Sequence, residues 1–166
     1  MRLLPRAGSL LAALLVVANC SATSETTKTA RNMSDTTTPE VGRTATDRDL
    51  ACLAEAVYFE ARGTGASGET AVAHVVVNRA KSPKFPSSVC GVVGDGCQFS
   101  YRCDGRADVL ADPRARARAV EVAETVLEGA PDITKGALFF HSARVAPGWF
   151  STRSRVGTFG GNVFYR

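Results

Sequence analysis

The chain has 166 residues, of which 45% are hydrophobic and 22% are charged, and its formal charge is +4. This length and composition fit one globular domain and exclude a multidomain protein. The basic residues are scattered, whereas a nucleic-acid-binding surface needs lysine and arginine clustered on one face. The run of Arg114, Arg116 and Arg118 alternates with alanine on a predicted helix, which is typical of a solvated face. We therefore expect no nucleic-acid partner.

The first 22 residues have the layout of a secretory signal peptide. Arg2 and Arg6 precede an apolar run over residues 10–18, and the small residues Ser21 and Ala22 follow it. The run is too short to span a bilayer, which takes about 20 apolar residues. We therefore expect residues 1–22 to be removed and the protein to be exported to the periplasm or the cell envelope.

The same segment also approximates a lipoprotein processing box, in which Cys20 would be the acylated residue. Asn19 directly precedes this cysteine and is an unusual residue at that position. Plain cleavage near Ala22 is therefore the preferred interpretation, and lipidation of Cys20 is the alternative. A lipid on Cys20 is the only membrane anchor that we expect.

Four cysteines remain beyond this segment, an even number that predicts two disulfides in an oxidising compartment: Cys52, Cys90, Cys97 and Cys103. Four cysteines allow three pairings, and pairing Cys97 with Cys103 would close a short loop and leave Cys52 with Cys90. The spacings contain no CxxC pair, and the only histidines are His74 and His141, so we expect no structural metal and no cofactor. An even cysteine set also argues against a free catalytic thiol.

Residues 23–46 are rich in threonine and serine and nearly devoid of bulky apolar side chains. Such a segment cannot bury enough surface to offset its chain entropy, and it is predicted to be a disordered tether. Residues 47–166 then form the folded domain, which we expect to be monomeric.

Residues 47–62 are predicted to form a helix that contains the first candidate catalytic residue. Apolar residues recur at helical spacing from Leu50, Asp47 or Asp49 can cap the start, and Gly63 stops the helix. Glu55 falls on the solvated side, while Glu60 falls at the margin of the apolar stripe in the last turn. Burial and the helix dipole would both raise the pKa of such a carboxyl, as a general acid needs. The alternative is that Glu60 only pairs with a nearby arginine, Arg62 or Arg79.

The remaining pattern predicts an α+β domain that is mainly helical and has short C-terminal strands. A second helix is expected from Ser67 or Gly68 to Arg79, and a third over residues 113–128 with Asp112 as its cap. A cross-linked loop covers residues 94–106, and short strands are expected over residues 137–140 and 163–165. We interpret His74 in the second helix as a satisfied, partly buried histidine.

Several motifs in series resemble one known family. These are residues 54–63 (AEAVYFEARG), residues 71–79 (AVAHVVVNR), Phe85-Pro86, Gln98-Phe99-Ser100 and Phe164-Tyr165. In this order they are similar to the bacterial cell-wall hydrolases related to spore cortex-lytic enzymes, over essentially the whole folded unit. The resemblance implies a lysozyme-like, transglycosylase-type α+β fold, peptidoglycan glycan strands as substrate, and Glu60 as the catalytic acid.

Two departures from the family pattern bear on the reaction. Thr64 stands where many relatives have a second Glu, and Asn162 stands where His usually precedes the closing aromatic pair. Hydrolysis by the usual glycosidase route needs two carboxyl groups, whereas a lytic transglycosylase can use one Glu to form 1,6-anhydro-muropeptides. Cleavage of the β-1,4 bond between N-acetylmuramic acid and N-acetylglucosamine by transglycosylation is therefore favoured. Glu69 is the fallback second acid, and Asn162 is assigned no catalytic role.

Five further residues are candidates for binding the glycan: Gln98, Ser100, His141, Trp149 and Tyr165. The first two offer hydrogen bonds to sugar hydroxyls and N-acetyl groups, and the aromatic rings suit the apolar face of a sugar. Each ring could equally be part of the core. A muramidase-type hydrolase, a peptidoglycan amidase and a non-catalytic glycan-binding envelope domain remain the alternative functions.

Overall fold

The computed structural model describes the backbone of residues 40–166 and the side chains of residues 47–166. The predicted signal peptide, Cys20 and most of the predicted tether lie outside the described residues. Helices precede the strands in this part of the chain, so the predicted α+β class is confirmed. The elements are α1 (Glu40–Ala61), α2 (Gly65–Lys81), α3 (Val89–Val93), η1 (Ser100–Cys103), α4 (Pro113–Leu127), β1 (Phe139–Ser142), η2 (Phe150–Thr152), β2 (Arg155–Phe159) and β3 (Asn162–Tyr165).

Helix α1 begins earlier than the sequence pattern predicts. It starts at Glu40, so Asp47 and Asp49 lie inside the helix and the prediction that one of them caps it is wrong. The earlier turns were missed because the apolar periodicity begins only at Leu50. The predicted end is confirmed: α1 stops at Ala61, and Gly63 takes a positive φ of 84°, a conformation that favours glycine.

Helix α4 shows why its start could be predicted from local chemistry. The Asp112 side chain accepts hydrogen bonds from the backbone N–H groups of Arg114 and Ala115 at 2.9 and 3.1 Å. Pro113 occupies the first helical position, where its missing N–H costs nothing. The Tyr58 hydroxyl accepts a hydrogen bond from the Asp112 N–H at 3.0 Å and so ties this helix start to α1.

The main core lies between the helices and consists largely of small aliphatic side chains. Leu53, Val57, Val76, Val92 and Ala123 are almost completely buried in it. A second cluster joins the end of α1 and one face of α2 to the sheet: Ala61, Ala71, Val72, Val75, Ala137 and Phe164. The end of α1 is therefore fixed by packing on two sides.

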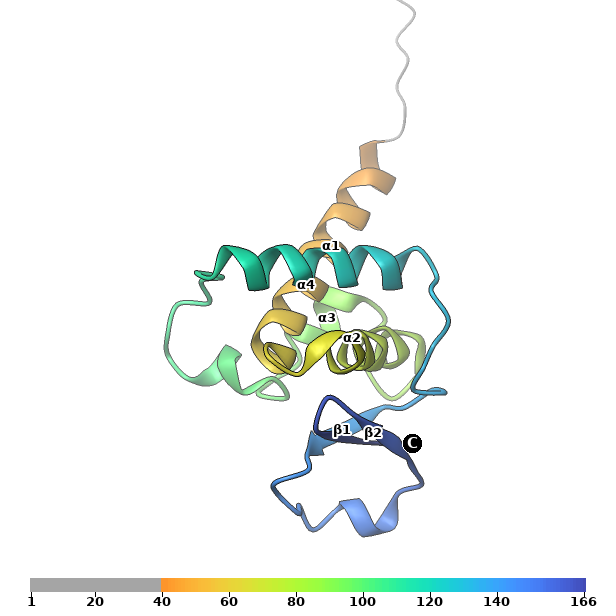
Figure 1. Cartoon of the computed structure of the whole chain (residues 1–166). Helices are drawn as coiled ribbons and strands as arrows, with labels where there is room; N and C mark the ends of the chain where they lie inside the picture. The colour runs from red at the N-terminus through yellow and green to blue at the C-terminus, as the bar shows by residue number, and fades with distance from the viewer. Residues whose placement is uncertain (1–39) are drawn as a thin grey trace, which may run out of the picture. The chain divides into compact units, whose positions relative to one another are not determined.

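The C-terminal sheet has the order β1-β3-β2, and both pairings are antiparallel. It lies across α2 from α4 (Figure 1). Strand β2 was missed in the sequence because its pattern is interrupted by Gly157, where the β2–β3 register shifts. Helix α3 was missed because five residues are too few to show a period, although Ser88 caps it by accepting from the N–H of Gly91.

The turn between β2 and β3 touches α2 backbone to backbone. A Cβ atom added to Gly160, which has a φ of +55°, would lie 2.7 Å from the Cα of Gly68 and 2.5 Å from the carbonyl oxygen of Thr64. A Cβ on Gly68 would lie 2.9 Å from the Cα of Gly160. No side chain fits at either position without moving the backbone.

Both predicted disulfides are present. Cys52 in α1 is bonded to Cys90 in α3, and Cys97 is bonded to Cys103 around the loop that precedes and includes η1. The first bond connects the helix that carries Glu60 to a separate element. Among the described residues, none of the helices is sufficiently long and apolar to cross a membrane.

Candidate active site

Glu60 lies in the last turn of α1 with its side chain partly buried. Burial raises the pKa of this carboxyl, and the nearby cation of Arg79 opposes the rise. Glu60 forms no ion pair within the described part of the chain. The side chain of Arg62 instead donates a hydrogen bond to the Tyr58 hydroxyl at 3.0 Å. Burial of Glu60 thus favours the protonated form of its carboxyl group.

Arg79 supplies a fixed positive charge near Glu60. It is 6% exposed in the last turn of α2, and its Nε donates to the carbonyl oxygen of Leu138 at 2.8 Å. Its guanidinium carbon lies 5.2 Å from the ring centre of Phe85 and 5.6 Å from that of Phe99. Burial lowers the pKa of Arg79 to about 10, so the group stays charged at neutral pH.

Tyr101 closes another side of the region around Glu60. Its ring stacks on Phe59 with 4.4 Å between the centres. Burial and the neighbouring carboxyl groups of Glu55 and Glu60 raise its pKa above the ordinary value, so the phenol stays neutral. Its buried hydroxyl lies near Glu55 but makes no hydrogen bond within the described residues. Glu55 is held by Arg102 at 3.0 Å and is less exposed than the sequence predicted.

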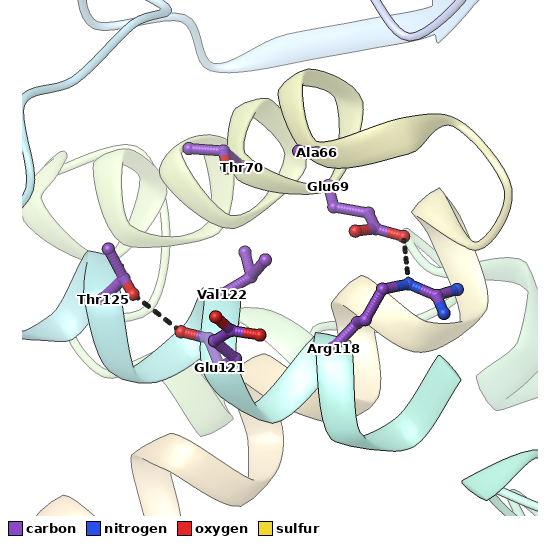
Figure 2. A pocket seen from close by; sticks show the side chains of 7 residues that line it. All are labelled: Ala66, Glu69, Thr70, Arg118, Glu121, Val122 and Thr125. Atoms are coloured by element: carbon purple, nitrogen blue, oxygen red, sulfur yellow. Dashed lines mark hydrogen bonds and ion pairs between the residues drawn. The ribbon is translucent and has the colours of Figure 1, made fainter. Parts of the chain in front are cut away.

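Glu69, the fallback second acid, lies in α2 rather than in α1. It is 5% exposed, and its carboxylate lies 3.7 Å from Nε of Arg118. Figure 2 shows this carboxylate beside a cavity between α2 and α4, directed toward Arg118 on α4. The residues that line the cavity are Ala66, Glu69, Thr70, Arg118, Glu121, Val122 and Thr125. Glu60 is not among them.

Gln98 and Ser100 lie on the exposed surface of the disulfide-closed loop, on either side of the buried Phe99. Gln98 donates a hydrogen bond to the carboxylate of Asp95 at 3.1 Å, and Ser100 begins η1. The loop therefore presents two polar side chains while Phe99 and Tyr101 anchor it near Glu60.

The structure brings the three predicted aromatic binding residues together. Nε2 of His141 lies 3.0 Å from the hydroxyl of Tyr165, and Nδ1 lies 2.8 Å from the carbonyl oxygen of Ser142. Trp149 stands edge-on to both rings, 5.6 Å from His141 and 5.7 Å from Tyr165. Trp149 is 37% exposed, whereas Tyr165 is only 4% exposed. Tyr165 is therefore a buried side chain that holds the ring of His141 in place.

His74 belongs to a structural network away from these groups. It is 3% exposed, and its Nδ1 lies 3.8 Å from the carboxylate of Asp132. Its Nε2 is buried and makes no hydrogen bond with the described residues, so the expectation of a satisfied, partly buried histidine is wrong. Burial lowers the pKa of His74. Burial works against the charged form of Asp132, but hydrogen bonds from Thr134, Asn78 and Gly136 outweigh it and lower its pKa to about 2. Asp132 thus organises the turn before β1.

The described residues contain no cluster of histidine, cysteine or carboxylate side chains suited to a metal ion. Each cysteine among them belongs to a disulfide.

Arg79, Tyr101 and Asp132 have roles that sequence reasoning did not assign. Arg79 was considered only as an ion-pair partner of Glu60, although it stands in one of the motifs that carry the resemblance. Tyr101 directly follows Ser100 and gave no separate signal. The spacing of Asp132, Thr134 and Gly136 is a turn signal that was available.

The fold and the comparisons define the class of protein. The model of the Cell Wall Hydrolase family matches residues 63–165, and the chain belongs to this family. The match begins three residues after Glu60. The predicted lysozyme-like fold agrees with two solved structures, each with a TM-score of 0.60. One is the catalytic domain of the germination-specific lytic transglycosylase SleB from Bacillus anthracis (30% identity, 71% of this chain and 93% of that chain), and the other is the catalytic domain of the Bacillus cereus SleB protein (29%, 72% and 91%).

The chain is also similar in sequence to curated spore cortex-lytic enzymes. The chain is 32% identical over 118 residues to the spore cortex-lytic enzyme of Halalkalibacterium halodurans, and 31% identical over 118 residues to that of Bacillus subtilis. Each alignment covers 71% of this chain, but only 34% and 37% of the respective relatives. The chain therefore spans about a third of the length of these enzymes, over their region of similarity.

Proposed function

We propose that this protein is a peptidoglycan glycosidase of the lytic transglycosylase type, with Glu60 as its single catalytic carboxyl group. The observation that carries the proposal is the setting of Glu60. Burial raises its pKa, and Arg79 is the charge among the described residues that perturbs it. Glu55 and Glu69 are paired with arginines, and Asp95, whose charge acts on Arg79, accepts a hydrogen bond from Gln98. Two carboxyl groups sharing one site would perturb each other strongly.

The setting matches the sequence of proton transfers that transglycosylation needs. Protonated Glu60 donates its proton to the oxygen of the β-1,4 bond between N-acetylmuramic acid and N-acetylglucosamine, and that bond breaks. The resulting carboxylate accepts the proton of the 6-hydroxyl of the muramic acid residue, whose oxygen closes the 1,6-anhydro ring on C1. Arg79 stabilises the carboxylate in the interval, and Glu60 ends protonated again.

The glycan would extend over two surfaces beside Glu60. Gln98 and Ser100 offer hydrogen bonds from the disulfide-closed loop, and Trp149 and His141 offer aromatic faces from the sheet, with Tyr165 holding His141 in place. The titles of the two SleB catalytic domains and the names of the cortex-lytic relatives support an enzyme that acts on the cell wall. Two disulfides agree with action outside the cytoplasm.

The test is mass spectrometry of the soluble products formed from intact peptidoglycan by the full chain, by Glu60→Gln and by the control Glu69→Gln. We expect anhydro-muropeptides from the parent and from Glu69→Gln, and none from Glu60→Gln, which is nearly isosteric but cannot donate the proton. Products with reducing ends would mean a hydrolase, and free peptides would mean an amidase. If the parent released no soluble product of any of these kinds, a non-catalytic glycan-binding domain would be favoured.

A further inference from the structure

Arg153, between η2 and β2, is an arginine whose charge has no partner in the described part of the chain. Its guanidinium carbon lies 3.4 Å from the ring centre of Phe139 and 5.7 Å from that of Trp149. Its Nε is buried and makes no hydrogen bond, and no carboxylate in that part of the chain forms an ion pair with it. Stacking on rings holds a guanidinium in place but leaves its N–H groups in need of acceptors.

The C-terminal segment that contains Arg153 carries charge of one sign. From Ile133 to residue 166 the sequence contains no Asp or Glu, but it contains five basic residues: Lys135, Arg144, Arg153, Arg155 and Arg166. A segment of this kind attracts anions. Of these five, Arg153 is the one that is packed on aromatic rings, so it is pre-oriented while the others are exposed.

A series of contacts links Arg153 to the candidate active site. Arg153 stacks on Phe139, and the ring centres of Phe139 and Phe85 lie 6.1 Å apart. The ring centre of Phe85 lies in turn 5.2 Å from the guanidinium carbon of Arg79, the cation next to Glu60. Trp149 contacts Phe139 at 6.0 Å. A sugar ring bound on Trp149 would therefore lie close to the guanidinium of Arg153.

We propose that Arg153 is a carboxylate-binding residue that makes this surface selective for glycans that carry an acidic substituent. The ligand is a carboxylate of the substrate, either the lactyl group of N-acetylmuramic acid or a carboxylate of the stem peptide. A planar guanidinium can bind either through two parallel hydrogen bonds. The inference rests on the proposed function, because it takes peptidoglycan as the substrate.

The test is equilibrium binding of three soluble glycans of equal length to the full chain carrying Glu60→Gln, which prevents turnover. The first has free lactyl carboxylates, the second has lactyl groups in amide linkage to stem peptides, and the third has lactyl groups converted to primary amides. Without any change at Arg153, we expect the third glycan to bind about tenfold more weakly than a carboxylate-bearing one, since charged hydrogen bonds are lost.

Variants then assign the effect to Arg153. Arg153→Gln should abolish the preference for carboxylates, and Arg153→Lys should keep part of it, because lysine has the charge but not the planar pair of donors. Arg155→Gln is the matched control: Arg155 is exposed on β2 and donates to the Thr158 hydroxyl at 2.8 Å. It should leave the preference intact. Loss confined to the first glycan identifies the lactyl group, and loss confined to the second identifies the stem peptide.

Three results would overturn the proposal. Equal loss on all three glycans would mean that Arg153 only holds its loop, and equal loss in Arg155→Gln would mean that the attraction is non-specific. Equal binding of the three glycans by the chain that carries only Glu60→Gln would show that there is no preference for carboxylates. This result does not require Arg153→Gln to fold. Product analysis with the parent tests the proposed function separately, because it does not depend on Arg153.

Discussion

The helical region around Glu60 and the C-terminal sheet are built from different side chains. The helical core is filled mainly by valine and alanine, nearly all fully buried, and a disulfide ties α1 to α3. The sheet region exposes large apolar groups: Trp149 is 37% exposed, Phe150 36% and Val145 57%. Close-packed interiors resist displacement, whereas exposed rings are free to contact a ligand.

Under the proposed function, the difference predicts separate roles for the two regions. Proton transfer needs a carboxyl group held within a narrow range of positions, and we propose that the helical region supplies it as Glu60. Glycan recognition needs accessible apolar faces with a few oriented polar groups, and we propose that the exposed rings of the sheet region provide them. Substitutions in the first region should therefore change turnover or stability, and substitutions in the second should change affinity.

The largest effect is expected at Glu60. Glu60→Gln should lower kcat by about 10²–10⁴-fold, the usual contribution of general acid–base catalysis. It should leave the affinity for glycan nearly unchanged. Because burial raises the pKa of Glu60 in the folded state, its stabilising contribution is present at low pH and is lost as the pH rises through that pKa. We therefore also expect Glu60→Gln to unfold at a higher temperature than the parent at neutral pH; a lower one would contradict the burial argument.

The second effect concerns the two disulfides. In the chain-entropy model, the bond between Cys52 and Cys90, with a separation of 38 residues, contributes about 4 kcal/mol to the free energy of unfolding. The bond between Cys97 and Cys103, with a separation of 6, contributes about 2 kcal/mol. Denaturant unfolding of the two double-alanine variants measures both. Equal losses would show that the helical region does not depend on its cross-link more than the loop does.

The third effect tests the recognition region. Trp149→Ala should raise KM roughly tenfold and leave kcat nearly unchanged, since it removes binding that is equal in the ground and transition states. Val145→Ala, in the same exposed segment, is the control and should change neither constant. A fall in kcat without a change in KM would place Trp149 with the chemistry and would break the division between the two regions.

The smallest effect is a shift in pH dependence. The cation of Arg79 lowers the pKa of Glu60 against the effect of burial, so Arg79→Met should raise that pKa further. Turnover requires the protonated acid and is lost as the pH rises, and this alkaline limit should therefore move to higher pH in the variant. The rate profile of folded protein measures it, and a shift to lower pH would contradict the assignment of Glu60 as the acid.

Local signals made much of the helical region predictable. Asp112 and Pro113 marked the start of α4, Gly63 marked the end of α1, and the spacing from Leu50 placed Glu60 at a buried margin. These features depend on neighbours in sequence, so one chain is enough to detect them. The pairing of the cysteines was one of three possibilities, and the structure selects the pairing that the short loop suggested.

The sheet region and the surroundings of Glu60 were less predictable, because they depend on contacts between distant segments. Tyr101 acquires its role from Phe59 and Glu55, and Arg153 acquires its position from Phe139. Gly157 interrupts the alternation that would have marked β2. Nothing in the residues adjacent to these positions reports their partners.

The contact between Gly68 and Gly160 joins the two regions through their backbones. The position of the sheet relative to the end of α1 is therefore set by two positions that cannot accept even one methyl group. Rings and charges on the outer surface of the sheet can change during evolution without moving this junction. If the proposed roles hold, such changes would alter which glycans this protein selects while the distance from the sheet to Glu60 stays the same.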